Sequence, residues 1–282
     1  MKRKSDMFVR GLINFCAMIS VLIVVGILGY VFVRGIRTVT PEFLFSETSV
    51  LNGTTGIAGN ILNTLYVIVI TLLFAAPIGV GSAIYLNEYA KPGKLVRLIE
   101  FTTETLSGIP SIIFGLFGFI FFGNVLHLGY SILTGCFTMT LMVLPLITRN
   151  TQEALKTVPD SYRTGALGMG AEKWHMIRTI LLPAAMPGII TGIILAIGRI
   201  VGESAALLFT AGSGYVLPKT LQAAYQKIFQ SGGTMTIQMY LSMQNGLYDI
   251  AFGIAVVLLA LVLVINFLTH YLSSKFDVSK RK

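Results

Sequence analysis

The stretch that decides the fold is RNTQEALKTVPDSYRTGALGMGAEKWHMIRTILL, residues 149–182, a polar segment followed directly by Pro183. It lies between two apolar runs, residues 130–148 and 183–197. A polar loop between two membrane spans is typical of the place where a membrane protein meets a soluble partner. A solvated linker between the spans explains the same pattern, so the residues alone leave both interpretations open.

The composition argues against a soluble fold. Of the 282 residues, 54% are hydrophobic and only 12% are charged, whereas ordinary globular domains carry about 25% charged residues. About 20 apolar residues cross a bilayer, and runs without polar–apolar alternation favour helices over a membrane barrel. We therefore predict an all-α integral membrane protein with six transmembrane helices, at residues 11–33, 61–86, 105–123, 130–148, 184–210 and 250–268.

The net charge of +9 reflects membrane topology rather than nucleic-acid binding. Most lysines and arginines fall in segments that lie on one side of the predicted spans, which is the positive-inside asymmetry. Both termini are then cytoplasmic. The predicted domain is residues 11–270, with residues 1–10 and 271–282 as cytoplasmic segments, residues 149–183 as a cytoplasmic loop and residues 211–249 as an outside segment.

Several kinds of chemistry are not expected. Cys16 and Cys136 lie within predicted spans, which argues against a disulfide framework. The three histidines, at positions 127, 175 and 270, have no metal-ligand spacing. No glycine-rich phosphate loop follows a strand, so the chain is not expected to bind ATP by itself. We predict no cofactor and no catalytic residue.

Two charged residues, Arg199 and Glu203, lie inside the fifth apolar run, where charges are costly and tend to be functional. Small residues recur every four positions before them, which lets a neighbouring helix approach closely: Ala184, Gly188, Gly192 and Ala196. On a continuous helix both charges share this face. An intrahelical ion pair that only anchors packing is one interpretation. The other is that Arg199 meets an anionic substrate, with Glu203 neutralising it between turnovers.

The polar loop predicts two short helices. Pro159 suits the start of a helix over residues 160–167, which Gly168 and Gly170 then break. A second helix is predicted over residues 171–182, ending at Pro183. Two short helices at an angle would make a knob below the membrane.

This loop resembles that of ABC-importer permeases, which has the form Glu-Ala-Ala, three residues, Gly, nine residues, Ile, one residue, Leu-Pro. The chain matches it from Gly170 through Ile180 to Leu182–Pro183 and has Thr164, Gly165 and Ala166 in place of Glu-Ala-Ala. In the family, this loop is the coupling helix that fits the ATP-hydrolysing subunit. The residues that the resemblance assigns to this contact are Tyr162, Arg163, Thr164, Gly165, Ala166, Gly168, Gly170 and Trp174.

Four further stretches are similar to phosphate-specific importer permeases of the PstA type. They are ETLSGIPSIIFGLFG (104–118), LPLITRNTQEALKTVP (144–159), LGMGAEKW (167–174) and GRIVGESAALLFTAG (198–212). The resemblance implies the type I ABC importer permease fold in a bacterial or archaeal inner membrane. It implies that Arg199 and Glu203 line the route of phosphate. The implied partners are a sister permease of the PstC type, a dimer of ATP-binding subunits and an outside phosphate-binding protein.

Three alternatives stay open. An ABC permease for another oxyanion, such as molybdate or sulfate, would show the same architecture. An ATP-independent anion channel or carrier would not need the coupling loop. A scaffold that assembles other membrane proteins would not need charges inside a span.

Overall fold

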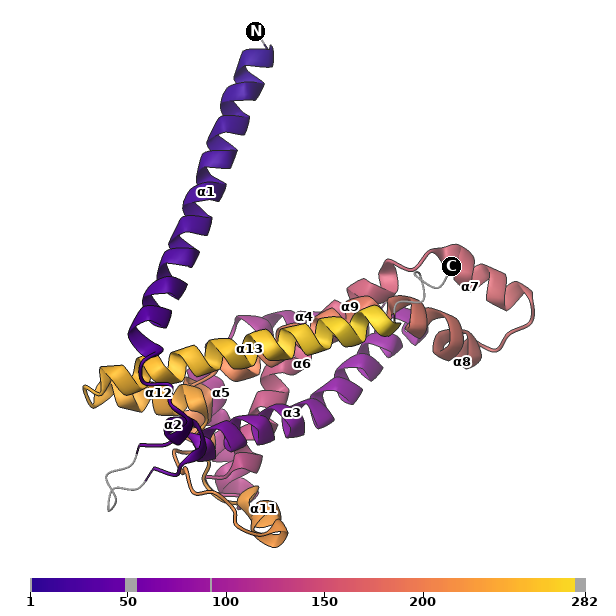
Figure 1. Ribbon diagram of the computed structural model, residues 1–282. Helices are drawn as coiled ribbons and strands as arrows, with labels where there is room; N and C mark the ends of the chain where they lie inside the picture. The colour runs from indigo at the N-terminus through magenta and orange to yellow at the C-terminus, as the bar shows by residue number, and fades with distance from the viewer. Residues whose placement is uncertain (1, 49–54, 92, 277–282) are drawn as a thin grey trace.

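The computed structural model describes residues 2–48, 55–91 and 93–276, and all regular structure in this part of the chain is helical (Figure 1). Five helices are long and apolar enough to cross a membrane, and a bent pair makes a sixth candidate span, as predicted. The α-helices are α1 Lys2–Gly35, α2 Pro41–Phe45, α3 Ala58–Ile84, α4 Lys94–Gly108, α5 Ser111–Gly118, α6 Ile132–Lys156, α7 Asp160–Gly168, α8 Lys173–Met176, α9 Leu182–Gly202, α10 Ala205–Thr210, α11 Leu221–Lys227, α12 Met235–Gln244 and α13 Tyr248–Phe276.

The body of the protein forms around α6, which packs against both α3 and α9. Its core consists of fully buried apolar side chains from these helices and from α10, among them Met139, Ile147, Ile200 and Leu207. α5 and α10 pack against each other and against α6, and α13 packs against α9, α12 and α1. The outside segment predicted at residues 211–249 contains α11 and α12.

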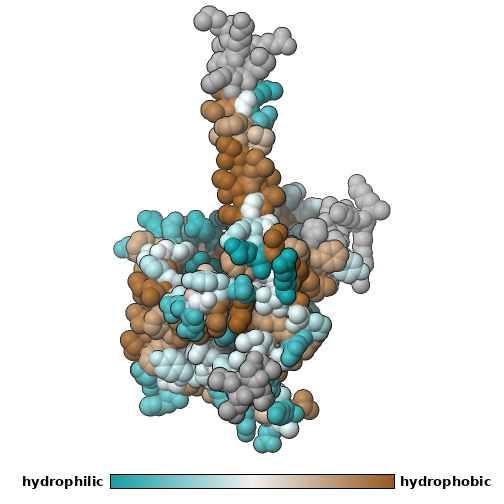
Figure 2. Space-filling view, turned by 60° about the vertical axis from the view of Figure 1, so that its left-hand side comes forward, coloured by the Kyte–Doolittle hydropathy of each residue, from teal (hydrophilic) through white to brown (hydrophobic). Residues whose placement is uncertain are grey.

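α1 stands apart from this body (Figure 1). No residue in the most apolar 18-residue stretch of α1 is buried within the chain. Figure 2 shows the hydrophobic surface of this helix extending away from the other helices. The contact with α13 lies near its C-terminal end, where Tyr30 meets Phe252 edge to face at 5.7 Å between ring centroids. The apolar surface of α1 is thus available to lipid or to another subunit.

The prediction of one continuous third span over residues 105–123 was wrong. α4 and α5 meet at an angle of 104°, and the break lies at Ile109 and Pro110. Proline disfavours the helical conformation in the residue before it, and Ile109 is extended, with φ −74° and ψ 132°. A π-helical segment, Phe119–Val125, continues α5.

The polar loop is shorter than predicted, because helices continue into it from both sides. α6 extends past Thr148 to Lys156, through residue types that favour helix. At the other end, α8 passes through a π-helical turn, Ile177–Leu181, directly into α9. The predicted helix end at Pro183 was wrong, since this proline lies in the first turn of α9, directly after the π-helical turn.

The fifth predicted span, residues 184–210, is divided in two. α9 ends at Gly202, and Glu203 is extended, with φ −83° and ψ 124°. α10 begins two residues later at Ala205. Arg199 and Glu203 therefore do not share a continuous helix.

Candidate functional site: an arginine-lined cavity and a coupling knob

The loop helices α7 and α8, with the turn that joins them, form a knob at one end of the body (Figure 1). We call residues 160–176 the coupling knob, after the role that the family resemblance implies for this loop. The predicted helix over residues 160–167 is confirmed as α7, which begins after Pro159. Its end is a Schellman motif, in which the Gly170 N–H donates to the Leu167 carbonyl and the Ala171 N–H to the Ala166 carbonyl. Gly170 has φ +85° there, a conformation that favours glycine.

The coupling knob has an outer and an inner face. Large apolar side chains are exposed on the outer face: Tyr162, Leu167, Met169 and Trp174. Thr164, Gly165 and Gly168 are exposed with them. Ala166 and Met176 are buried on the inner face, where they pack with Ile84 of α3, Leu155 of α6 and Ile189 of α9. The knob is therefore packed onto the ends of three long helices.

Arg163 also faces inward. Its guanidinium donates to the carboxylate of Glu88, to the carboxylate of Asp160, and to the carbonyl oxygens of Leu155 and Val158. Its side chain is 18% exposed. The family resemblance groups Arg163 with the residues that meet the ATPase, but its donors are used within this chain.

The structure separates the two charges predicted in the fifth span. One carboxylate oxygen of Glu203, Oε1, accepts a hydrogen bond from the Ala206 N–H at 3.0 Å. The Glu203 carbonyl accepts from Thr236 Oγ1 at 3.0 Å. Glu203 is buried, at 7% exposure, whereas Arg199 is exposed. The intrahelical ion pair is absent from the described residues because α9 ends between the two.

Arg199 lines a cavity of about 380 Å³ together with Arg149. The cavity lies where the bend between α4 and α5 faces α6 and α9. Its polar lining also includes Ser107 beside the bend and two residues of α6, Asn150 and Glu153. Two guanidinium groups at one cavity favour an anionic occupant.

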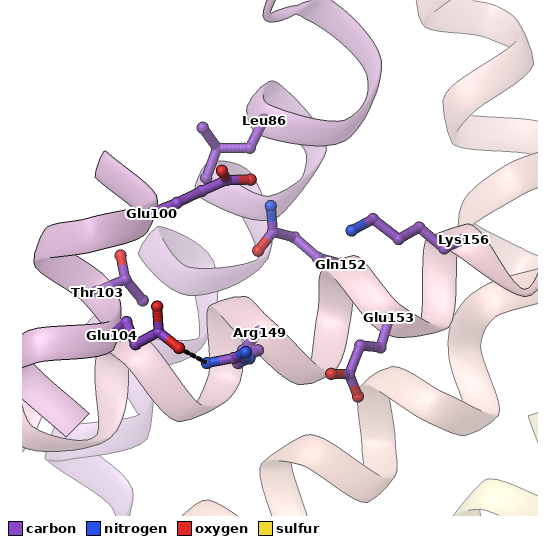
Figure 3. A pocket seen from close by; sticks show the side chains of 8 residues that line it. All are labelled: Leu86, Glu100, Thr103, Glu104, Arg149, Gln152, Glu153 and Lys156. Atoms are coloured by element: carbon purple, nitrogen blue, oxygen red, sulfur yellow. Dashed lines mark ion pairs between the residues drawn. The ribbon is translucent and has the colours of Figure 1, made fainter. Parts of the chain in front are cut away.

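A second cavity, of about 240 Å³, shares Arg149 and Glu153 with the first. Figure 3 shows Arg149 and Glu104 pointing toward each other from α6 and α4. Their atoms Nη1 and Oε1 are 3.7 Å apart, and both side chains are more than half exposed. Glu100, Gln152 and Lys156 complete much of the polar lining. Arg149 thus stands at the boundary of two adjoining cavities.

Sequence reasoning missed Arg149, which it placed at the first position of the polar loop. The sequence did contain a helical pattern. Five residues are separated by three, one, three and four positions in turn: Met142, Pro145, Leu146, Arg149 and Glu153. These spacings place them on one helix face, and all five line the first cavity. The apolar run alone does not show how far the helix continues.

The small-residue face of α9 is confirmed as a close contact with α6. A Cβ atom added at Gly192 would lie 2.7 Å from Asn150 Cβ, and one added at Gly188 would meet Ala154. Ala196 is fully buried, whereas Ala184 at the start of the stripe is exposed. This contact holds Arg199 and Arg149 on neighbouring helices.

Comparison with known proteins supports this architecture. The family model described as binding-protein-dependent transport system inner membrane component matches residues 75–278. A probable ABC transporter permease, YqgI of Bacillus subtilis, is 34% identical over 97% of each chain. The phosphate transport system permease PstA of Yersinia pestis is 39% identical over 55% of this chain and 52% of its own. The resemblance to PstA-type permeases is thereby confirmed.

Solved structures show the same fold at low sequence identity. A bacterial alginate ABC transporter chain matches with a TM-score of 0.67 and 17% identity, covering 95% of this chain and 96% of that one. A chain of the MetNI methionine ABC transporter matches with a TM-score of 0.59 and 19% identity, covering 78% and 94%. The fold is that of type I ABC importer permeases. The chain belongs to the family of binding-protein-dependent transport system inner membrane components and is a permease subunit of an ABC importer.

Proposed function

We propose that this chain is the permease subunit of an ATP-driven importer of inorganic phosphate and forms half of its translocation pathway. The observation that carries the proposal is the cavity lined by both Arg149 and Arg199. The similarity to curated phosphate permeases supports the substrate. The chain performs no bond chemistry, and ATP hydrolysis belongs to a partner subunit.

The arginines suit a phosphate ion because the planar guanidinium group stays charged and offers paired donors to oxyanions. Arg199 is exposed in this chain alone, and a sister permease of the PstC type would supply the facing wall. Glu203 takes part indirectly, because it caps α10 at the break that ends α9 just beyond Arg199.

The coupling knob provides the link to ATP. Its exposed apolar side chains, such as Tyr162 and Trp174, suit docking into a groove of an ATP-binding subunit. A dimer of such subunits would close on ATP and move the knob. A phosphate-binding protein would deliver the anion on the opposite side. Both termini and the knob are then cytoplasmic, in agreement with the positive-inside distribution of charge.

The test is uptake of radiolabelled phosphate into proteoliposomes that hold this chain with its cognate permease, ATPase and binding protein. We expect uptake that requires ATP and that excess phosphate, but not sulfate or molybdate, outcompetes. Arg199→Ala should reduce uptake by at least about tenfold, because removing a charge-assisted contact costs about 1.5–3 kcal/mol. Arg199→Lys keeps the positive charge but lacks the paired donors of a guanidinium group. Its uptake should therefore lie between that of the wild type and that of Arg199→Ala.

Other outcomes would identify the alternatives. ATP-driven uptake that molybdate or sulfate outcompetes would keep the importer and change its substrate. Uptake without ATP would show that the protein acts as a channel or carrier and not as part of an ATP-driven importer. Phosphate uptake at the wild-type rate by Arg199→Ala would remove Arg199 from the route.

A further inference from the structure

The π-helical turn Tyr85–Tyr89 at the end of α3 carries a buried carboxylate, that of Glu88. The side chain of Glu88 is only 5% exposed. Arg163 Nε and Nη2 both donate to its Oε1, at 3.2 and 3.0 Å, and the two residues are 75 positions apart in sequence. This ion pair thus joins α3 to α7 of the coupling knob.

Further hydrogen bonds hold both partners of the pair in place. Arg163 also donates to the carbonyl of Leu155 in the last turn of α6 at 2.9 Å and to that of Val158 just after the helix at 3.0 Å. Asn87 Nδ2 donates to Glu88 Oε1 at 2.7 Å. Because breaking a buried pair leaves an uncompensated charge, the contact resists opening when the knob moves.

The same turn contacts α8. Lys173 Nζ lies 4.8 Å from the centroid of the Tyr89 ring, a cation–π contact. Directly before the turn, Ile84 is packed in the core that also contains Ala166 and Met176 of the knob. Both knob helices are therefore attached to the end of α3.

The opposite end of α3 is attached to the outside segment. Asn60 Nδ2 donates to the Gly233 carbonyl at 2.9 Å, and Asn63 Nδ2 donates to the carbonyls of Gly214 and Gly233. Both asparagines are fully buried. The Met235 N–H donates to Thr64, and the neighbouring Thr236 donates to the Glu203 carbonyl. α3 is thus one helix fastened to the knob at one end and to the surroundings of Glu203 at the other.

We propose that Glu88 is a positioning residue that transmits movement of the coupling knob into α3, and through α3 to the loop that holds Glu203. This inference rests on the proposed function as an importer subunit. It gives Arg163 the role of an internal anchor rather than of a contact with the ATPase.

The test uses the assembled transporter in proteoliposomes and measures ATPase activity with and without phosphate-loaded binding protein. Glu88→Gln removes the charge but keeps the size of the side chain. We expect the ratio of stimulated to basal ATPase activity to fall about fivefold or more, within the range of roughly 5- to 150-fold typical of coupled sites. The ATPase subunits should still co-purify, because the outer face of the knob is unchanged.

Glu42→Gln is the matched control, because it makes the same change at an exposed glutamate of α2 that lies outside the coupling knob. Its stimulation ratio should equal that of the wild type. If the Glu88→Gln transporter does not assemble, the Asn87→Ala variant provides the test. It keeps the ion pair between Glu88 and Arg163 and removes only the hydrogen bond from Asn87 to Glu88. Coupling should then fall about twofold, near the lower end of mutational effects on coupling.

A wild-type ratio in assembled Glu88→Gln, or in Asn87→Ala where Glu88→Gln does not assemble, would overturn this inference and leave the importer proposal intact. Absence of any stimulation in the wild-type complex would instead count against the proposed function. The two failures are therefore distinguishable.

Discussion

At the residue scale, Glu203 shows how a charge inside a membrane protein can serve the fold. Its carboxylate accepts the Ala206 N–H in the first turn of α10, where a helix has unpaired donors and favours negative charge. Burial at 7% exposure makes this acceptor hard to replace with water. The break between α9 and α10 therefore depends on an oxygen atom at this position.

Glu203→Gln should keep this hydrogen bond, because the amide oxygen can accept it, whereas Glu203→Ala should lose it. We expect the alanine variant to lose about 1 kcal/mol of stability, the usual effect of removing a helix cap, and the glutamine variant to lose less. Thermal unfolding of the purified permease complex measures the difference. Equal loss in the two variants would mean that the charge matters more than the hydrogen bond.

At the element scale, the close contact of α9 with α6 holds the two arginines at one cavity. Gly192 allows this approach because an added Cβ would lie 2.7 Å from Asn150 Cβ. Gly198, on the same helix, has no atom within 4 Å of an added Cβ. The same substitution at these two glycines therefore separates the close approach from the helix propensity of glycine.

Gly192→Ala should destabilise the protein by about 1–3 kcal/mol, as overpacking does. Gly198→Ala should be neutral or stabilise it by roughly 0.5–1 kcal/mol, because alanine favours a helix interior over glycine. Chemical unfolding of the two variants in detergent, followed by helical content, measures the effects. If Gly192→Ala were as stable as the wild type, α6 and α9 would not be held as closely as the structure shows.

At the scale of the whole molecule, the coupling knob turns an exposed apolar face away from the body. Trp174 on this face is 55% exposed, and exposed aromatic side chains of this kind often dominate binding. The inner face of the knob packs against the long helices of the permease. A substitution on the outer face should therefore leave the permease folded. Docking and folding can therefore be measured separately.

Trp174→Ala should weaken binding of the ATPase subunits by about 2 kcal/mol or more, as loss of an interface hot spot does, with unchanged thermal stability of the permease. Binding to the permease in lipid nanodiscs measures the affinity. Tyr225→Ala is the control, because Tyr225 is a 65% exposed aromatic residue in the outside segment. Unchanged affinity in Trp174→Ala would place the docking surface elsewhere.

The sequence by itself determined the features that depend on local chemistry. Long apolar runs specify membrane helices because no other open structure satisfies backbone groups in lipid. Pro159 and Gly170 set the start and end of α7, and the small residues Gly188 and Gly192 predicted the close contact of α9. The motifs of the loop indicated the family.

The tertiary structure alone decided which side chains meet. α9 stops at Gly202, next to Glu203, whose carbonyl accepts a hydrogen bond from Thr236 of another element, and apolar runs do not record such a contact. Arg163 faces inward because Glu88, 75 residues earlier in the chain, offers it a buried carboxylate. Arg149 joins Arg199 at one cavity because α6 and α9 pack closely. Such contacts arise from distant parts of the chain, so no local pattern specifies them.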